Sequence, residues 1–487
     1  MGVKTTLSIL RFEFHALGNV LIVLSLMGMM FYLFGEWEKN LAVLVSFAVI
    51  VFLVSLVRID LGLGILIVGM LFSPETEVGQ AGRRAITIRA EDLLILSLAM
   101  AWVVRRVLMG APWKSTPLNM PILLFSLSVL VSTMGGIALG WIDPTLAIFY
   151  VAKLIQFFLI FFFAVHFIED DKQILFFLGL FLAVGVVVSV YGLTQVGEVY
   201  RITAPFEGGR PEPNTFGGYL ITLIALGLPL AVYCPHPSMR LVLLGVSGLA
   251  FSALLFTLSR ASFLGLAGML VVLGILTRSK WLWLGIALFA LLHQSLLPQQ
   301  VMDRVNYTFS SPRGEVVELP VAIPFVGETI TVDSSTYERI DIWRKVLYTW
   351  TYDVYYFFLG WGVTRGNILD SQFARFLVEI GLVGVSLFSW LLWKVFKTAV
   401  WLRANTEDWV VKGFTVGYIA CFIGILIHSV GTITFYVVRI MEPFWFLTGI
   451  LMWWYLEERQ NREGVVGARS ESRVVWQPDL PWRQVDA

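Results

Sequence analysis

Ten arginines and a single lysine, Lys345, occupy one set of polar segments after residue 200. The arginines are Arg201, Arg210, Arg260, Arg304, Arg313, Arg339, Arg344, Arg365, Arg375 and Arg439. A guanidinium offers a planar fork of donors that binds phosphate in bidentate fashion, and it stays charged when partly dehydrated. We therefore expect these residues to bind an anionic substrate. The alternative is that they pair with nearby acids, among them Glu207, Asp303, Glu338 and Asp341.

Two short segments place such arginines where an apolar run begins. In the first, Arg210 and Asn214 flank two prolines, and Asn214 is placed to cap the helix that follows. A helix N-terminus is a ready anion site, although a turn and cap without a ligand would look the same. In the second, Ser259 and Arg260 interrupt two apolar runs. An arginine at that depth is costly, which favours a functional role over a snorkelling side chain.

The longest polar segment, 298–370, predicts irregular or strand-like structure first and an amphipathic helix from Ser335 onward. Ser335 and Glu338 have the spacing of a capping box. We expect Arg339 to project toward a membrane cavity, and Arg344 is a further candidate substrate-binding residue. The residues expected to pack against the membrane helices are Ile340, Trp343 and Leu347.

Asp370 opens the next helix, where it is placed to accept a proton from a hydroxyl or to serve as the N-cap. Glu379 lies deeper in that helix and needs a partner. His428 lies near the end of its apolar run, where it is either a base or a histidine hydrogen-bonded within the bundle. Arg365 and Arg375 complete the candidate substrate-binding residues. Neither the histidines nor Cys234 and Cys421 have the spacing of metal ligands, so no metal and no cofactor are expected.

The elements that must position these residues are membrane helices. Of 487 residues, 57% are hydrophobic and only 14% are charged, far from the composition of a soluble domain. The apolar runs predict an all-α polytopic membrane protein with about fourteen spans. The predicted spans are 16–34, 41–57, 60–72, 92–108, 121–141, 145–168, 173–193, 216–233, 241–258, 261–277, 281–297, 372–393, 413–433 and 442–456. The first run lacks a cleavage site and is taken as a retained helix.

The distribution of lysine and arginine in short loops predicts that both termini are cytoplasmic. The long segment 298–370 then faces outward as an extracytoplasmic loop. The predicted organisation is N-terminal membrane helices (1–193), membrane helices with the arginine motifs (194–297), the loop (298–370), C-terminal membrane helices (371–456) and a cytoplasmic tail (457–487).

The order of these motifs resembles the O-antigen ligase and polymerase superfamily of bacterial polysaccharide assembly. The resemblance covers about residues 195–435 and rests on five motifs. They are Arg210-x-x-x-Asn214, Ser259-Arg260, Arg339-x-x-x-Trp343, Gly360-x-Gly362 and Glu379-x-Gly381-x-x-Gly384. The first half of the chain is similar only as a stack of membrane helices.

The resemblance implies a GT-C-like fold and a metal-independent, inverting glycosyltransferase at the outer face of the bacterial inner membrane. The implied donor is an oligosaccharide on undecaprenyl pyrophosphate, held by Arg210, Arg260 and Arg339, with Arg201 as a further candidate. Ligases of this superfamily usually carry His-Asn where this chain has Asp370-Ser371. That difference favours a polymerase of O-antigen or exopolysaccharide repeat units. The implied partners are the lipid-linked donor, a glycan acceptor, membrane lipids and a chain-length regulator protein, with no nucleic acid.

Two alternatives remain open. A ligase would move finished glycan to lipid A core or to another acceptor, and the acceptor site that separates it from a polymerase is not evident in the sequence. A transporter of an anionic substrate would carry charges at mid-membrane depth and inverted repeats. Lys153 is the clear mid-span charge of the first half, and no repeat is evident, which favours an enzyme.

Overall fold

The protein is described by a computed structural model covering residues 41–73, 75–81, 84–110, 113–206, 212–309, 315–318, 329–332, 334–351, 353–366 and 369–474. The predicted span 16–34 and the candidate residue Arg210 lie outside these ranges. The backbone of Arg339 is described as part of a helix, whereas its side chain is not.

The described chain is mostly helical, with two short antiparallel hairpins. In chain order its elements are α2 (Leu41–Val57), α3 (Ile59–Phe72), β1 (Glu75–Ala81), β2 (Arg84–Arg89), α4 (Ala90–Met109), α5 (Asn119–Ala138), α6 (Pro144–Phe167), α7 (Asp171–Thr194), α8 (Pro213–Tyr233), α9 (Pro237–Phe256), α10 (Arg260–Thr277), α11 (Lys280–Leu296), α12 (Gln299–Phe309), β3 (Glu315–Glu318), β4 (Thr329–Val332), α13 (Ser334–Trp350), α14 (Val354–Leu359), α15 (Gln372–Asn405), α16 (Trp409–Gly431), η2 (Thr434–Tyr436) and α17 (Val438–Val474).

Each predicted span within the described residues coincides with one of these helices. Eight of the described helices, α5 to α10, α15 and α16, are long and apolar enough to cross a membrane. The chain is therefore a multi-pass helical membrane protein. Shorter apolar stretches occur in α2, α3 and α11, so the total of fourteen spans stays a prediction.

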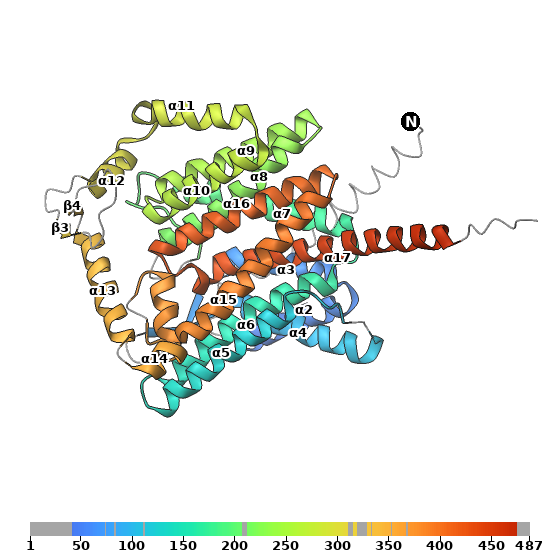
Figure 1. The fold of residues 1–487 in the computed structure, drawn as a ribbon, viewed down its shortest axis with the longest axis horizontal. Coiled ribbons are helices and arrows are strands. Elements are labelled where there is room, and N and C mark those ends of the chain that lie inside the picture. The colour runs from blue at the N-terminus through green and yellow to red at the C-terminus, as the bar shows by residue number, and fades with distance from the viewer. Residues whose placement is uncertain are drawn as a thin grey trace, which may run out of the picture.

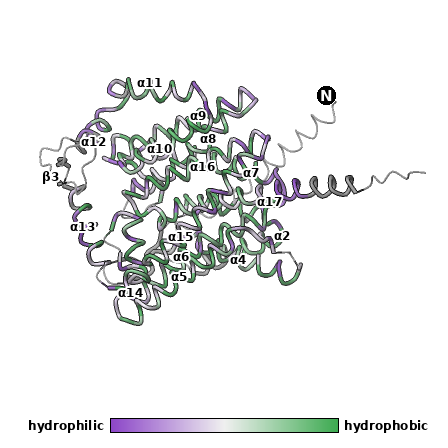
Figure 2. Tube along the Cα trace, in the orientation of Figure 1, coloured by the Kyte–Doolittle hydropathy of each residue, from purple (hydrophilic) through white to green (hydrophobic). Residues whose placement is uncertain are grey.

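The long helices run side by side, and α13 crosses one end of the bundle, which we call the α13 end (Figure 1). The C-terminal part of α17 projects from the opposite end, which we call the tail end. Figure 2 shows hydrophilic residues on α12, on α13 and where α17 leaves the bundle, with hydrophobic residues along the bundle between them. This distribution suits helices that cross a bilayer and expose polar residues at both ends.

Glycines bring α8, α10 and α16 into close contact. A Cβ atom at Gly265 of α10 would lie 2.8 Å from the carbonyl oxygen of Gly424 of α16. A Cβ atom at Gly217 of α8 would collide with Ser262 of α10. Small residues allow membrane helices to approach this closely. The contact sets the beginnings of α8 and α10 beside the end of α16.

The segment between α11 and α15 contains the amphipathic helix that the sequence predicts, here α13, after a strand-like part that forms β3 and β4. Helix α12, by contrast, was not predicted. The prediction of which α13 residues pack against the bundle is wrong for Leu347, which is 42% exposed. Besides Trp343, the residues that pack on the start of α15 are Ile342 and Val346, which meet Leu369, Ala374 and Val378.

Helix α15 bends at Gly381, where φ is 62° and ψ is −172°. The backbone of Gly360, with φ 77°, lies directly against this bend, because a Cβ atom there would be 2.6 Å from the Gly381 nitrogen. The two glycines thereby fasten the segment after α14 to α15. This close approach explains why both positions need a residue without a side chain.

Candidate functional site

The structure brings together Arg201, Asn214 and Ser259 at the α13 end of the bundle. Oδ1 of Asn214 accepts a hydrogen bond from Nη2 of Arg201 at 3.1 Å and another from Oγ of Ser259 at 2.8 Å. The three residues come from the segment after α7, the first turn of α8 and the N-cap of α10. One amide oxygen therefore joins three separate parts of the chain.

The break between α9 and α10 presents two backbone carbonyls to arginines. Nε of Arg201 donates to the Thr257 oxygen at 2.9 Å, and Nε of Arg304 donates to the Leu258 oxygen at 3.4 Å. Leu258 has a φ of 49°, an uncommon conformation for a residue with a branched side chain. Ser259 then starts α10 as an N-cap, since its Oγ accepts from the Ser262 nitrogen at 3.2 Å.

Positive charge accumulates at this break. Burial lowers the pKa of Arg201, and the neighbouring Arg304 and Arg260 lower that pKa further, while Glu212 acts in the opposite direction. Arginine still stays protonated at any physiological pH. Arg260 is the first residue of α10, so the partial positive charge of the helix N-terminus adds to the guanidinium groups. We call Arg201, Asn214, Ser259, Arg260 and Arg304 the arginine cluster.

Asn214 does not cap α8 as the sequence suggested. The N-cap position belongs to Glu212, and Asn214 lies inside the first turn. Its side chain instead accepts hydrogen bonds from Arg201 and Ser259. The prediction was wrong because the helix begins at Pro213, two residues earlier than an Asn214 cap would require, and proline is common at the first helical position.

His428 lies next to the arginine cluster but is enclosed. Its side chain contacts α8 and α10, because a Cβ atom at either Gly218 or Gly265 would be 3.2 Å from it. Nδ1 bonds the hydroxyls of Thr434 at 2.8 Å and Thr432 at 3.0 Å. The residue is 1% exposed. Although the ring lies beside the Asn214 backbone, Nε2 has no hydrogen-bond partner among the described residues.

Asp370 is exposed and precedes α15, whose N-cap is Ser371. The suggested cap role for Asp370 is therefore wrong. The start of α15 adjoins the turn that holds His428, since the Gln372 nitrogen donates to the Thr432 oxygen at 3.2 Å. Asp370, two residues before Gln372, is exposed.

Three other candidate arginines lie apart from the arginine cluster. Arg344 is exposed on α13. Arg365 is exposed, lies over the Trp361 ring and donates to the Trp141 oxygen at 3.4 Å. Arg375 is fully buried and pairs with Glu379 at 3.0 Å, which supplies the partner expected for that glutamate. Among the candidate substrate-binding residues, Arg375 has the structural role that the sequence left as the alternative.

Two further arginines of the predicted anion-binding set, Arg304 and Arg439, have contacts at or near the arginine cluster. Arg304 enters the arginine cluster from α12. Arg439, which is 1% exposed, donates from Nη1 to the Pro205 oxygen at 2.6 Å and from Nη2 to the Phe206 oxygen at 2.8 Å. It therefore anchors the segment that carries Arg201. Both residues belong to the set of arginines that the sequence suggested, but nothing in the sequence indicated which members of that set lie close together.

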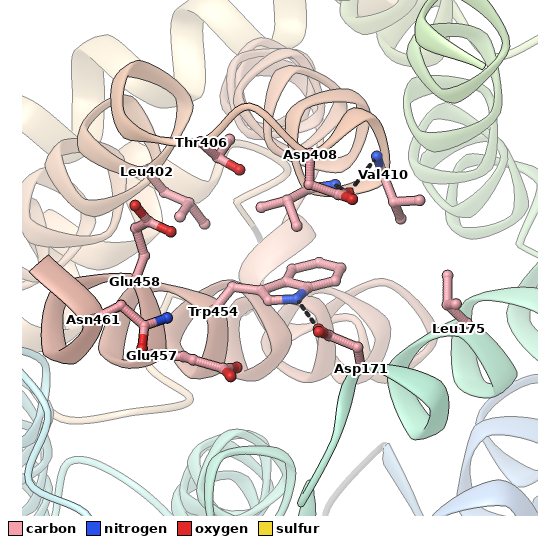
Figure 3. Close-up of a pocket in the computed structure, with 11 residues that line it drawn as sticks. Asp171, Leu175, Leu402, Thr406, Asp408, Val410, Trp454, Glu457, Glu458 and Asn461 are labelled. Carbon is pink, nitrogen blue, oxygen red and sulfur yellow. Dashed lines mark hydrogen bonds between the residues drawn. The ribbon is translucent and has the colours of Figure 1, made fainter. Parts of the chain in front are cut away.

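A cavity of about 250 Å³ lies at the tail end, between α7, α15, α16 and α17 (Figure 3). Four carboxylates line it, those of Asp171, Asp408, Glu457 and Glu458. Nε1 of Trp454 donates to Asp171 at 2.7 Å, as Figure 3 shows. The acidic lining disfavours an anion, so this cavity does not suit the substrate class that the arginine cluster would bind.

No protein-family model and no curated protein matches the chain. Within the described ranges, moreover, no group of three or more His, Cys, Asp or Glu residues has an arrangement that could hold a metal ion.

Proposed function

We propose that the chain is a glycosyltransferase that polymerises oligosaccharide repeat units carried on undecaprenyl pyrophosphate. The observation that supports this most is the approach of Arg201, Arg260 and Arg304 to the N-terminus of α10. Guanidinium groups and a helix N-terminus together suit a diphosphate. The superfamily resemblance supplies the sugar chemistry, and it adds Arg210 and Arg339 as further ligands of the diphosphate.

The proposal includes an orientation in the bacterial inner membrane. With fourteen spans and both termini in the cytoplasm, the α13 end faces outward and the tail end faces inward. This orientation is supported by the basic residues that follow α10 and lie on α15 toward the tail end, Arg278, Lys280, Lys397 and Arg403. The acidic cavity of Figure 3 would then open toward the cytoplasm.

The proposed reaction is a single displacement. A hydroxyl of one lipid-linked glycan attacks the anomeric carbon of another, forming a new C–O bond with inversion. The bond between that carbon and the phosphate oxygen breaks, and its electron pair stays on undecaprenyl pyrophosphate. The arginine cluster stabilises the negative charge that develops on the leaving group, which is the main catalytic contribution expected.

The proton of the attacking hydroxyl requires an acceptor, and Asp370 suits this role better than His428. Asp370 is exposed at the α13 end, whereas His428 is 1% exposed and has Nδ1 engaged by two threonines. A general base must reach the proton directly or through one water. His428 accordingly supports the start of α8 from within the bundle.

The test is complementation of a deletion strain, with surface glycans analysed by length. Deletion should leave single repeats on the acceptor and remove long chains, and Arg260→Ala should not restore them although the variant reaches the membrane. Arg459→Ala, which changes an exposed arginine on α17, is the matched control and should restore them. Loss of all attached glycan on deletion would identify a ligase. Full-length glycan from Arg260→Ala would refute the role of the arginine cluster.

A further inference from the structure

A second buried polar cluster lies between α4, α6 and α17. Lys153 of α6 pairs with Oδ1 of Asp92 in α4. Nε2 of Gln156, one helical turn along α6, donates to Asp92 at 2.9 Å and to Oε1 of Glu442 in α17 at 2.8 Å. Glu91 lies beside Asp92 and is fully buried. None of these residues belongs to the arginine cluster.

The charges of this cluster do not balance. It contains three carboxylates, Glu91, Asp92 and Glu442, against two cations, Lys153 and Arg89, whose Nη1 is 3.5 Å from Glu91. If every group is ionised, the cluster carries one net negative charge. Glu91 and Glu442 are both 0% exposed. An uncompensated charge in such surroundings is strongly unfavourable.

Two oxygen atoms in the cluster lack partners. Oε2 of Glu91 and Oε2 of Glu442 make no hydrogen bond to any described residue. The two carboxylates also repel each other, since Glu91 is the like charge that acts most strongly on Glu442. Two buried carboxylates in one site rarely both ionise. A bound proton would remove the excess charge and the repulsion together.

We propose that this cluster is a proton-binding site and that the proton resides on Oε2 of Glu442. Glu91 has Arg89 at hand, and both Glu91 and Asp92 lie in the first turn of α4, where the helix dipole favours anions. Oε1 of Glu442 accepts a hydrogen bond from the neutral amide of Gln156. Of the three acids, Glu442 is thus the least supported as an anion.

The charged and polar groups that surround Glu442 determine how tightly it binds the proton. They are Arg89 at the end of β2, Glu91 and Asp92 in the first turn of α4, and Lys153 and the neutral Gln156 of α6. The side chains of Asp92 and Lys153 retain 18% and 11% exposure, unlike the two glutamates. Asp92 and Lys153 are thus the members of the cluster that remain partly exposed. This inference is independent of the proposed glycosyltransferase activity.

The direct test is infrared spectroscopy of the full-length protein in lipid nanodiscs at neutral pH. The wild type should show the carbonyl band of a protonated carboxylic acid, and Glu442→Gln should lack it. Glu407→Gln, which changes a 99% exposed carboxylate, should retain it. Absence of the band from the wild type overturns the proposal. A band that survives Glu442→Gln but disappears in Glu91→Gln overturns the assignment to Glu442.

Thermal unfolding between about pH 6 and about pH 9 provides a second readout. An unfolded glutamate holds its proton only near or below about pH 4.3, so the native state binds the extra proton and loses stability as pH rises. Relative to the wild type, Glu442→Gln should show a smaller loss over this range, whereas Glu407→Gln should match the wild type. Glutamine has the shape of the neutral acid, so failure of Glu442→Gln to fold, or an unchanged pH dependence, would count against the site.

Discussion

Nε of Arg375 donates a hydrogen bond of 3.0 Å to Oε1 of Glu379, and both side chains are completely buried. The same oxygen accepts hydrogen bonds from the backbone nitrogens of Thr364 at 2.9 Å and Gly366 at 3.2 Å. The hydroxyl of Tyr436 donates to the other carboxylate oxygen at 2.6 Å. One glutamate therefore joins α15 to the turn before it and to η2.

Replacing Glu379 by alanine should destabilise the protein severely. The change leaves the Arg375 charge buried without its counter-ion, which costs about 3–5 kcal/mol. Thermal unfolding of the purified protein in detergent should show a correspondingly lower midpoint. Asp341→Ala removes the exposed ion pair with Lys345 and should leave the midpoint unchanged. Equal midpoints for the two variants would contradict the structural role of the buried pair.

Gly381→Ala should also destabilise, for a different reason. The backbone at Gly381 has a positive φ, and an added Cβ atom would collide with the carbonyl of Phe358. Strain of this kind costs on the order of 1–3 kcal/mol. Gly179→Ala is the matched control, since a Cβ atom there meets nothing within 4 Å. If both alanine variants unfold at the same temperature, the contact between α14 and α15 is not tight.

Arg201 should tolerate neither alanine nor lysine. Alanine removes the charge and should lower the rate of polymer formation from lipid-linked repeats by about 100-fold. Lysine keeps the charge but lacks the fork that bonds Thr257 and Asn214 together, so activity should still fall by about 10-fold. Arg459→Ala should retain the wild-type rate. Full activity of Arg201→Lys would show that charge alone suffices.

Asp370→Asn should slow the same reaction, because an amide cannot accept the proton of the attacking hydroxyl as the exposed carboxylate can. General-base catalysis contributes about 100-fold or more where it operates. Asp341→Asn, which changes an exposed aspartate of α13, should have the wild-type rate. A normal rate for Asp370→Asn would mean that the hydroxyl loses its proton elsewhere.

The partly buried Lys114 should make the free energy of unfolding depend on pH in the alkaline range. Burial lowers the pKa of its ammonium group, an effect that Glu169 and Glu457 only partly oppose. Above that lowered pKa the unfolded chain binds more protons than the native protein, so the free energy of unfolding rises with pH. The gain should be complete above about pH 10.4, the usual pKa of lysine. Lys114→Met should show a smaller gain than Lys397→Met, which changes an exposed lysine.

The sequence predicted the positions of the helices well because an apolar run of span length has few alternatives in a membrane protein. It could not predict which ends of the helices meet, since the approach of Arg201 to Asn214 and Ser259 depends on the packing of α8 against α10. The buried charges were missed for a related reason. Asp92 and Glu442 were taken as the starts of spans, whereas their helices begin earlier, at Ala90 and Val438.

Arg375 shows what more could have been inferred. A glutamate four residues after an arginine on one helix indicates an ion pair. Arg375 has such a glutamate, Glu379, whereas Arg260 has none, so the sequence could have distinguished the two arginines. The role of Arg304, however, depends on where α12 lies after a break in the helical pattern. No local pattern in the sequence indicates such a position.

Arg439 donates hydrogen bonds to the carbonyls of Pro205 and Phe206, which precede it in the chain by 234 and 233 positions. The segment that presents Arg201 is synthesised long before the helix that fixes it. Completion of the arginine cluster must therefore await insertion of the last described helix during biosynthesis. A nascent chain that stops before α17 would have most of its membrane helices in place and no assembled site.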